Sequence, residues 1–113
     1  MATGKIERFE KEFVDITALS GYEISYNRSV KIGKTIFIVA RIAKTSGTLP
    51  TAWTNIAKIN NVSFGQAFMS VAAASGSNDL LRCEISPTGV IAVQQTTSNG
   101  SGTGAFINMC IGV

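Results

Sequence analysis

The sequence predicts an all-β fold, namely an antiparallel β-sandwich of the jelly-roll type. Apolar and polar residues alternate with a period of two along several short segments, as on strands with one buried face. Polar turns rich in glycine and serine separate these segments at short intervals, which gives about seven or eight strands. The length of 113 residues suits one domain with a modest core, and we expect this domain to span residues 13–113.

The N-terminal segment, residues 1–12, is predicted to be a linker or a short helix. Ile6, Phe9 and Phe13 follow the i, i+3, i+7 spacing of one helix face, and Thr3 is a suitable N-cap. A helix this short is marginal by itself. A linker into the first strand and the stub of a coiled-coil stalk therefore remain alternatives.

The clearest strand signal runs from Tyr22 to Lys44 and predicts a long hairpin. In its first strand the polar residues take odd positions and the apolar residues take even ones, which are Tyr22, Ile24, Tyr26, Val30 and Ile32. Gly33 supplies the turn. The second strand, at 35–43, is apolar on both faces up to Arg41. Both faces of this strand need a cover, either a second sheet or another copy of the chain.

The other expected strands follow the same alternation and are separated by turn residues. The turn at 86–89 has proline near its start and glycine at its end, as tight hairpin turns often do. The glycine- and serine-rich stretch at 96–104 is expected to be a loop. The strands themselves are expected at 13–18, 57–61, 66–74 (with a short helix as the alternative), 80–86, 91–95 and 105–113.

Charge is sparse and dispersed in this chain. Charged residues make up 15% of the sequence, against about 25% in typical domains. A neutral surface of this kind is often used in subunit contacts. The net charge of +3 is spread without a basic run, so the sequence does not predict nucleic-acid binding.

The residues needed for common catalytic and metal sites are missing or scattered. The chain has no histidine, which excludes histidine-activated nucleophiles and the usual zinc sites. The carboxylates are not clustered, and we interpret Asp79 and Glu84 as solvated surface acids. Cys83 and Cys110 are expected to be free thiols. We therefore predict no enzyme activity, no catalytic residue, no metal and no cofactor.

Neither a secretion signal nor a membrane-spanning segment is expected. The N-terminus is charged and lacks an apolar core, and no stretch approaches the roughly 20 apolar residues of a transmembrane helix. These features predict synthesis and folding in a reducing cytosol without membrane insertion.

A few aromatic and amide side chains are candidates for contacts with a ligand. Trp53 is the single tryptophan, and it either stacks on a sugar ring or plugs the open end of the domain. The two tyrosines of the hairpin either form a contact row with the next basic residue or pack in the core or at a subunit contact. The predicted ligand-binding residues are Trp53, Tyr22, Tyr26, Arg28, Asn55 and Asn78.

The order of the sequence segments resembles a viral family. The strand VKIGKTIFIVARI leads into the loop GTLPTAW, and the hairpin CEISPTGVIAV precedes a glycine- and serine-rich loop and a final apolar strand. This order resembles the C-terminal domains of bacteriophage tail fibres and of receptor-binding or baseplate proteins. The likeness covers residues 22–113. One departure is that Pro50 is followed by Thr-Ala-Trp, where the family often has a Gly-aromatic-Pro segment.

The resemblance implies a homotrimer on the virion that contacts host cell-surface saccharide and other tail or baseplate proteins. It also implies synthesis in the cytoplasm of the bacterial host. In such a trimer one face of the strand at 35–43 fills the domain core and the other lines the threefold axis. The predicted interface residues are Ile36, Phe37, Ile38, Val39 and Ile42. The alternative is a purely structural trimerisation or assembly domain of the virion that binds no glycan.

Overall fold

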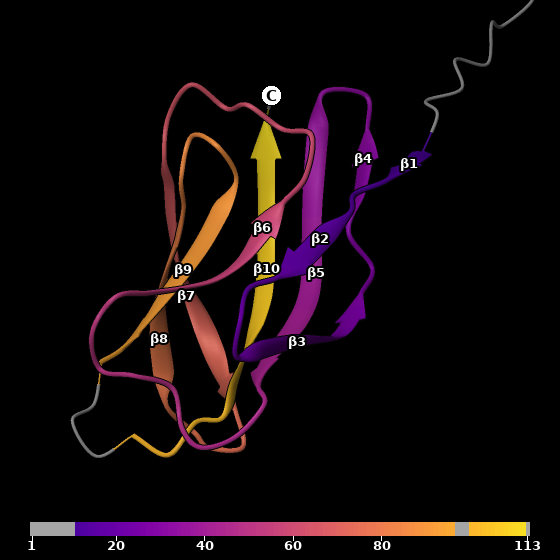
Figure 1. The fold of residues 1–113 in the computed structure, drawn as a ribbon. Helices are drawn as coiled ribbons and strands as arrows, with labels where there is room; N and C mark the ends of the chain where they lie inside the picture. The colour runs from indigo at the N-terminus through magenta and orange to yellow at the C-terminus, as the bar shows by residue number, and fades with distance from the viewer. Residues whose placement is uncertain (1–10, 97–99, 113) are drawn as a thin grey trace, which may run out of the picture.

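The chain forms one curled, antiparallel β-sheet (Figure 1). A computed structural model describes residues 11–96 and 100–112, and within these ranges it contains ten strands and no helix. The predicted all-β fold is confirmed. The strands are β1 (Lys11–Phe13), β2 (Ile16–Ala18), β3 (Tyr22–Asn27), β4 (Val30–Ile32), β5 (Thr35–Lys44), β6 (Thr54–Ile59), β7 (Phe68–Ser75), β8 (Leu80–Ile85), β9 (Val90–Gln95) and β10 (Gly104–Gly112).

The strand order explains how one sheet encloses a core. Neighbouring strands follow the order β1-β4-β5-β10-β7-β8-β9-β6-β2, and β3 also pairs with β5. β10 pairs with β5 along its whole length but with β7 only over Gly104–Phe106. In Figure 1 β10, in yellow, separates from β7 beyond this short pairing. The covering layer is therefore the other half of the same curled sheet, which forms a half-barrel.

The core is built from branched aliphatic side chains. Strands on the two sides of the curl each contribute alternate residues, as the two-residue period predicts. Full burial of each such side chain contributes about 1.5–3 kcal/mol. The largest fully buried hydrophobic side chains are Ile38, Ile42, Ile56, Ile59, Leu81, Cys83, Ile85, Ile91, Val93, Ile107 and Ile111.

The N-terminal part of the chain connects the two ends of the sheet. Residues 1–10 of the predicted linker or helix lie outside the described residues, but Lys11 belongs to β1, which is extended because it pairs with β4. The strand predicted at 13–18 is interrupted at Val14 and Asp15. There the Val14 amide donates to the Ser29 carbonyl (3.1 Å) and the Asp15 carbonyl accepts from the Asn60 amide (2.9 Å).

The first strand of the predicted hairpin is divided and changes face. Ile24 lies opposite Ile42, but a register shift places Tyr26 opposite Arg41. Tyr22 and Tyr26 therefore lie on opposite faces of the sheet, contrary to the prediction of one shared face. The shift is typical of a β-bulge, in which an extra residue disrupts the two-residue period. Beyond it the apolar residues of β4 pair with outward-facing residues of β5, for example Val30 with Phe37.

The predicted turns are confirmed at the glycines that must adopt positive φ. Gly33 (φ 59°) joins β4 to β5, and Gly89 (φ 90°) completes the turn between β8 and β9. A side chain on Gly89 would place its Cβ 2.7 Å from the Ile59 carbonyl oxygen. Of the predicted alternatives for 66–74, the strand is confirmed, as β7.

Candidate functional site

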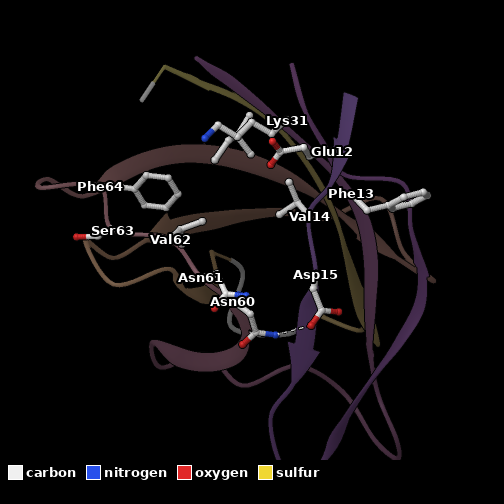
Figure 2. A pocket seen from close by; sticks show the side chains of 11 residues that line it. Glu12, Phe13, Val14, Asp15, Lys31, Asn60, Asn61, Val62, Ser63 and Phe64 are labelled. Atoms are coloured by element: carbon white, nitrogen blue, oxygen red, sulfur yellow. Dashed lines mark hydrogen bonds between the residues drawn. The ribbon is translucent and has the colours of Figure 1, made fainter. Parts of the chain in front are cut away.

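A pocket of about 380 Å³ opens where β1 meets the loop between β6 and β7 (Figure 2). One wall comes from β1 and the two residues that follow it, and the opposite wall comes from residues 60–64. The side chains at its walls are carboxylates, amides, a hydroxyl, an ammonium group and apolar groups. The lining residues are Glu12, Phe13, Val14, Asp15, Lys31, Ile36, Asn60, Asn61, Val62, Ser63 and Phe64.

The polar side of the pocket is held by Asn60. Its Nδ2 donates to Asp15 Oδ2 (2.9 Å) and to Thr17 Oγ1 (2.7 Å), and its backbone amide donates to the Asp15 carbonyl (2.9 Å). Figure 2 shows the first of these bonds as a dashed line between the two walls. Both Nδ2 protons are thus used within the chain. The side-chain oxygen of Asn60, Oδ1, is left as the acceptor that a ligand can use.

Apolar side chains and two oppositely charged side chains, Glu12 and Lys31, complete the walls. Figure 2 shows Val14 and Val62 on opposite sides of the pocket, with the Phe64 ring beside Val62. An edge-to-face contact with Phe68, at 5.5 Å between ring centroids, fixes the orientation of Phe64. Glu12 lies opposite Lys31 in the pairing of β1 with β4, and both side chains line the pocket.

The pocket combines groups that can form hydrogen bonds with groups that offer apolar contact. Its carboxylate and amide oxygens accept hydrogen bonds from hydroxyl groups, and the Lys31 ammonium donates them. Its apolar side chains offer contact area to C–H surfaces. A metal cluster is not part of this arrangement, because no three His, Cys, Asp or Glu residues within 11–96 and 100–112 are grouped to hold an ion.

The six residues predicted to bind a ligand come from three separate parts of the fold, and none of them lines the pocket. Trp53 (42% exposed) precedes β6, which carries the exposed Asn55, while the exposed Asn78 lies in the turn between β7 and β8. On β3, Tyr22 packs against the core. Within the set, Tyr26 and Arg28 are in contact, with the Arg28 guanidinium carbon 5.2 Å from the ring centroid of Tyr26.

The five predicted interface residues divide between the two faces of β5. Ile36, Ile38 and Ile42 are at most 2% exposed and belong to the core of their own chain, so their assignment to the interface is corrected. Phe37 (37% exposed) and the half-buried Val39 point outward. The five residues divide in this way because alternate side chains of a strand point to opposite faces. The sequence did not show which face is buried, because both faces of this strand are apolar.

Phe37 belongs to a row of apolar side chains that crosses four strands on the outer face. The pairing registers align one residue each from β1, β4, β5 and β10. We call this set the outer apolar row, and it consists of Phe13, Val30, Phe37 and Cys110. Phe13 is 81% exposed, and Figure 2 shows its ring directed away from the other residues that line the pocket.

Sequence reasoning did not identify the pocket. The Asn60-Asn61 pair after an apolar strand is a turn signal, and Asn61 indeed has a φ of 60°. That signal does not reveal that Asp15, 45 positions earlier, is the hydrogen-bonding partner of this turn. The contact depends on the pairing of β2 with β6, which places Ile16 opposite Ile59.

Comparison with known proteins gives no family assignment. No protein-family model matches the chain, and no curated protein or solved structure matches it significantly. Within the described residues there is also no helix of the length and apolarity required to cross a membrane.

Proposed function

We propose that this chain is a receptor-binding module of a bacteriophage tail or baseplate that contacts a host cell-surface saccharide. In this proposal it assembles as a homotrimer on the virion, together with other tail or baseplate proteins, after synthesis in the bacterial cytoplasm. The order of sequence segments supports the viral assignment. The observation that carries the saccharide contact is the pocket between β1 and residues 60–64.

The size and chemistry of the pocket suit a saccharide unit. A volume of about 380 Å³ falls in the range of small-molecule sites, which is about 300–1,000 Å³. Sugar hydroxyls need both donors and acceptors, and Lys31, Glu12 and Asn60 offer them around the opening. The apolar wall at Val62 and Phe64 offers contact to the C–H face of a sugar ring.

Binding of host cell-wall polysaccharide to pocket variants tests this function. Ser63→Trp adds a large side chain at the edge of the opening, and Glu12→Ala removes an exposed acceptor whose side chain makes no hydrogen bond to residues 11–96 or 100–112. We expect each variant to weaken binding at least about tenfold, the equivalent of one or two lost hydrogen bonds to a ligand. Trp53→Ala is the matched control, since Trp53 lies outside the pocket, and it should bind like the wild type. Loss of binding in Trp53→Ala with full binding in Ser63→Trp would place the saccharide at the loop instead.

The alternative function is a structural domain that trimerises, or joins neighbouring tail proteins, without binding glycan. The outer apolar row favours this alternative, because it offers a contact surface that shares only Phe13 with the lining of the pocket. An oligomer in solution combined with no binding to any host glycan would support the structural function.

We propose no catalytic role for the carboxylates. Asp79 accepts hydrogen bonds from Ser77 Oγ (2.8 Å) and from the Ser101 amide (3.1 Å), which suits a turn-stabilising residue. Glu84 lies on β8 opposite Met69 and Ala92. Incubation of host polysaccharide with the wild type should release no fragments, and release that Asp79→Ala or Glu84→Ala abolishes would contradict this view.

A further inference from the structure

We propose that the outer face of β1, β4, β5 and β10 is where copies of this chain contact one another, with the outer apolar row at the centre of the contact. This inference rests on the homotrimer of the proposed function and specifies the face that builds it. The occupant of the face is a second copy of the chain.

Exposed apolar side chains are concentrated on this face, and the outer apolar row itself contains no charged residue, although Lys11 lies opposite Ile32 beside it. Phe13 is 81% exposed, and Ile32 and Phe37 are each 37% exposed. Phe13 lies opposite Val30, and Phe37 lies between Val30 and Cys110, so the row is continuous across the four strands. A continuous apolar patch of this kind marks an interaction surface more often than a solvated one.

The bulge in β3 brings two further apolar residues to this face. An unbroken two-residue period from Ile24 would place Val30 and Ile32 on the core side. The register shift instead places Val30 opposite Phe37 and Ile32 opposite Thr35, and the break before β4 leaves that register unchanged. The sheet thus exposes side chains that it could have buried.

The face carries both a projection and a hollow, which argues for a second copy as the occupant. A shallow, largely apolar hollow of about 260 Å³ lies beside Phe37 and is lined by Val39, Asn108, Met109 and Cys110 among others. Phe13 projects from the same face. In a ring of three copies the projection of each copy can enter the hollow of the next, and threefold closure makes the three contacts identical.

The exposed apolar area of the face fits a weak contact whose remaining area comes from its polar rim. A phenylalanine side chain offers roughly 200 Å², so Phe13 and Phe37, which are 81% and 37% exposed, together leave about 230 Å² to cover. With Ile32, Val30, Val39 and Cys110 the face supplies on the order of 400 Å² per copy, or about 800 Å² for two copies before its rim is counted. Stable interfaces bury about 1,200–2,000 Å² in total, so a modest affinity is expected.

A second group of exposed apolar residues serves as the internal comparison. On β7, Met69 (64% exposed) and Val71 (65% exposed) lie opposite Glu84 and Arg82 of β8. Charged neighbours at each position make this surface a typical solvated one. We therefore assign the contact to the outer apolar row and expect β7 to stay exposed in the assembly.

Light scattering across about 5–200 µM protein tests the contact directly. The wild type should exceed the mass of one chain, 11.9 kDa, and approach three times that mass. Phe37→Asp and Phe13→Ser should each raise the dissociation constant at least about 30-fold, the effect of losing an interface hot spot. Phe13→Ser separates interface from folding, because Phe13 is 81% exposed on an edge strand. Val71→Asp is the matched control and should associate like the wild type.

Alkylation of the native cysteines gives a second readout. Cys110 is exposed and belongs to the outer apolar row, whereas Cys83 is 1% exposed and should not react in the folded chain. Cys110 should react with iodoacetamide at least about fivefold more slowly at 200 µM than at 5 µM protein. In Phe13→Ser the labelling rate of Cys110 should be the same at both protein concentrations. Cys110→Ser should show no labelling.

The outcomes distinguish this face from the wider function. A wild type that is monomeric at 200 µM overturns the inference. The inference is also overturned if Val71→Asp dissociates the oligomer while Phe37→Asp and Phe13→Ser leave it intact. In either case glycan binding at the pocket stands as a separate result. Conversely, if Phe13→Ser dissociates the oligomer of a protein that binds no glycan, that result would support this inference and contradict the saccharide binding of the proposed function.

Discussion

Tyr26 lies opposite Arg41 on the outer face of the sheet, although Ile24, two residues earlier, lies opposite Ile42 on the core side. The change of face occurs within one strand and is stabilised by Arg41, whose Nη1 donates to Ser25 Oγ (2.6 Å). Beyond the bulge, residues that would have filled the core face outward. The outer apolar row therefore depends on this one irregularity in β3.

Arg41→Ala should destabilise the fold by about 1–3 kcal/mol, because it removes charge-assisted hydrogen bonds across three strands. Arg41 Nε and Nη2 donate to Ser75 Oγ (2.9 and 2.6 Å), and Nη1 reaches Ser25 on β3. Urea denaturation followed by tryptophan fluorescence measures the loss. Arg82→Ala, at an exposed position on β8, is the control and should change the free energy of unfolding by less than about 0.5 kcal/mol. Equal effects of the two variants would rule out a bridging role for Arg41.

Ser29→Ala should cost about 1–3 kcal/mol, because a buried backbone amide loses its hydrogen-bond partner. Ser29 is fully buried between β3 and β4, and its Oγ accepts from the Val39 amide at 2.9 Å. The hydroxyl thus replaces a strand-to-strand bond where β3 ends. Hydrogen exchange of the Val39 amide should accelerate in Ser29→Ala. Ser29→Thr keeps the hydroxyl and is the control, in which the Val39 amide should stay protected. Faster exchange of this amide in both variants would indicate that packing around Ser29, and not the hydrogen bond, is responsible.

Gly89→Ala should destabilise the fold by at least about 3 kcal/mol, because backbone strain and a steric clash act together. Its φ is 90°, and an added Cβ would lie 2.7 Å from the Ile59 carbonyl oxygen and 2.6 Å from Val62 Cγ2. Gly47→Ala is a matched control with a φ of 78° and no atom within 4 Å, so it should cost only about 1 kcal/mol. The difference between the two melting temperatures isolates the clash, and equal temperatures would contradict it.

Alkaline pH should weaken the fold partly through Cys83. Burial, with the Glu84 charge as the smaller cause, raises the pKa of the Cys83 thiol to about 12 from an ordinary value of 9.0. The unfolded chain therefore loses this proton first as the pH rises. The contribution of the neutral thiol is fully present below pH 9 and decreases between pH 9 and 12, with a slope of at most about 1.4 kcal/mol per pH unit.

Denaturation of the wild type and Cys83→Ala between pH 7 and 11 measures this contribution. The variant should be less stable at pH 7, because it leaves a small cavity, and its stability should fall less steeply above pH 9. Because lysines and tyrosines titrate in both proteins, the difference in slope reports Cys83. Identical slopes would show that the thiol does not influence alkaline stability.

The fold class and most strand positions could be predicted from the sequence, because both follow from local properties. The two-residue alternation of β8 and the turns at Gly33 and Gly89 depend on neighbouring residues and on the φ angles that glycine allows. These features need no information about distant parts of the chain.

Which residues face outward and where the pocket lies could not be predicted from the sequence, because both depend on long-range pairing. The face of Tyr26 depends on pairing with Arg41, and the pocket depends on a contact between Asp15 and Asn60. A bulge reverses the face of every later residue in its strand, and a long-range hydrogen bond leaves no periodic trace in the sequence. The candidate surfaces of this protein therefore arise where local pattern and global pairing disagree.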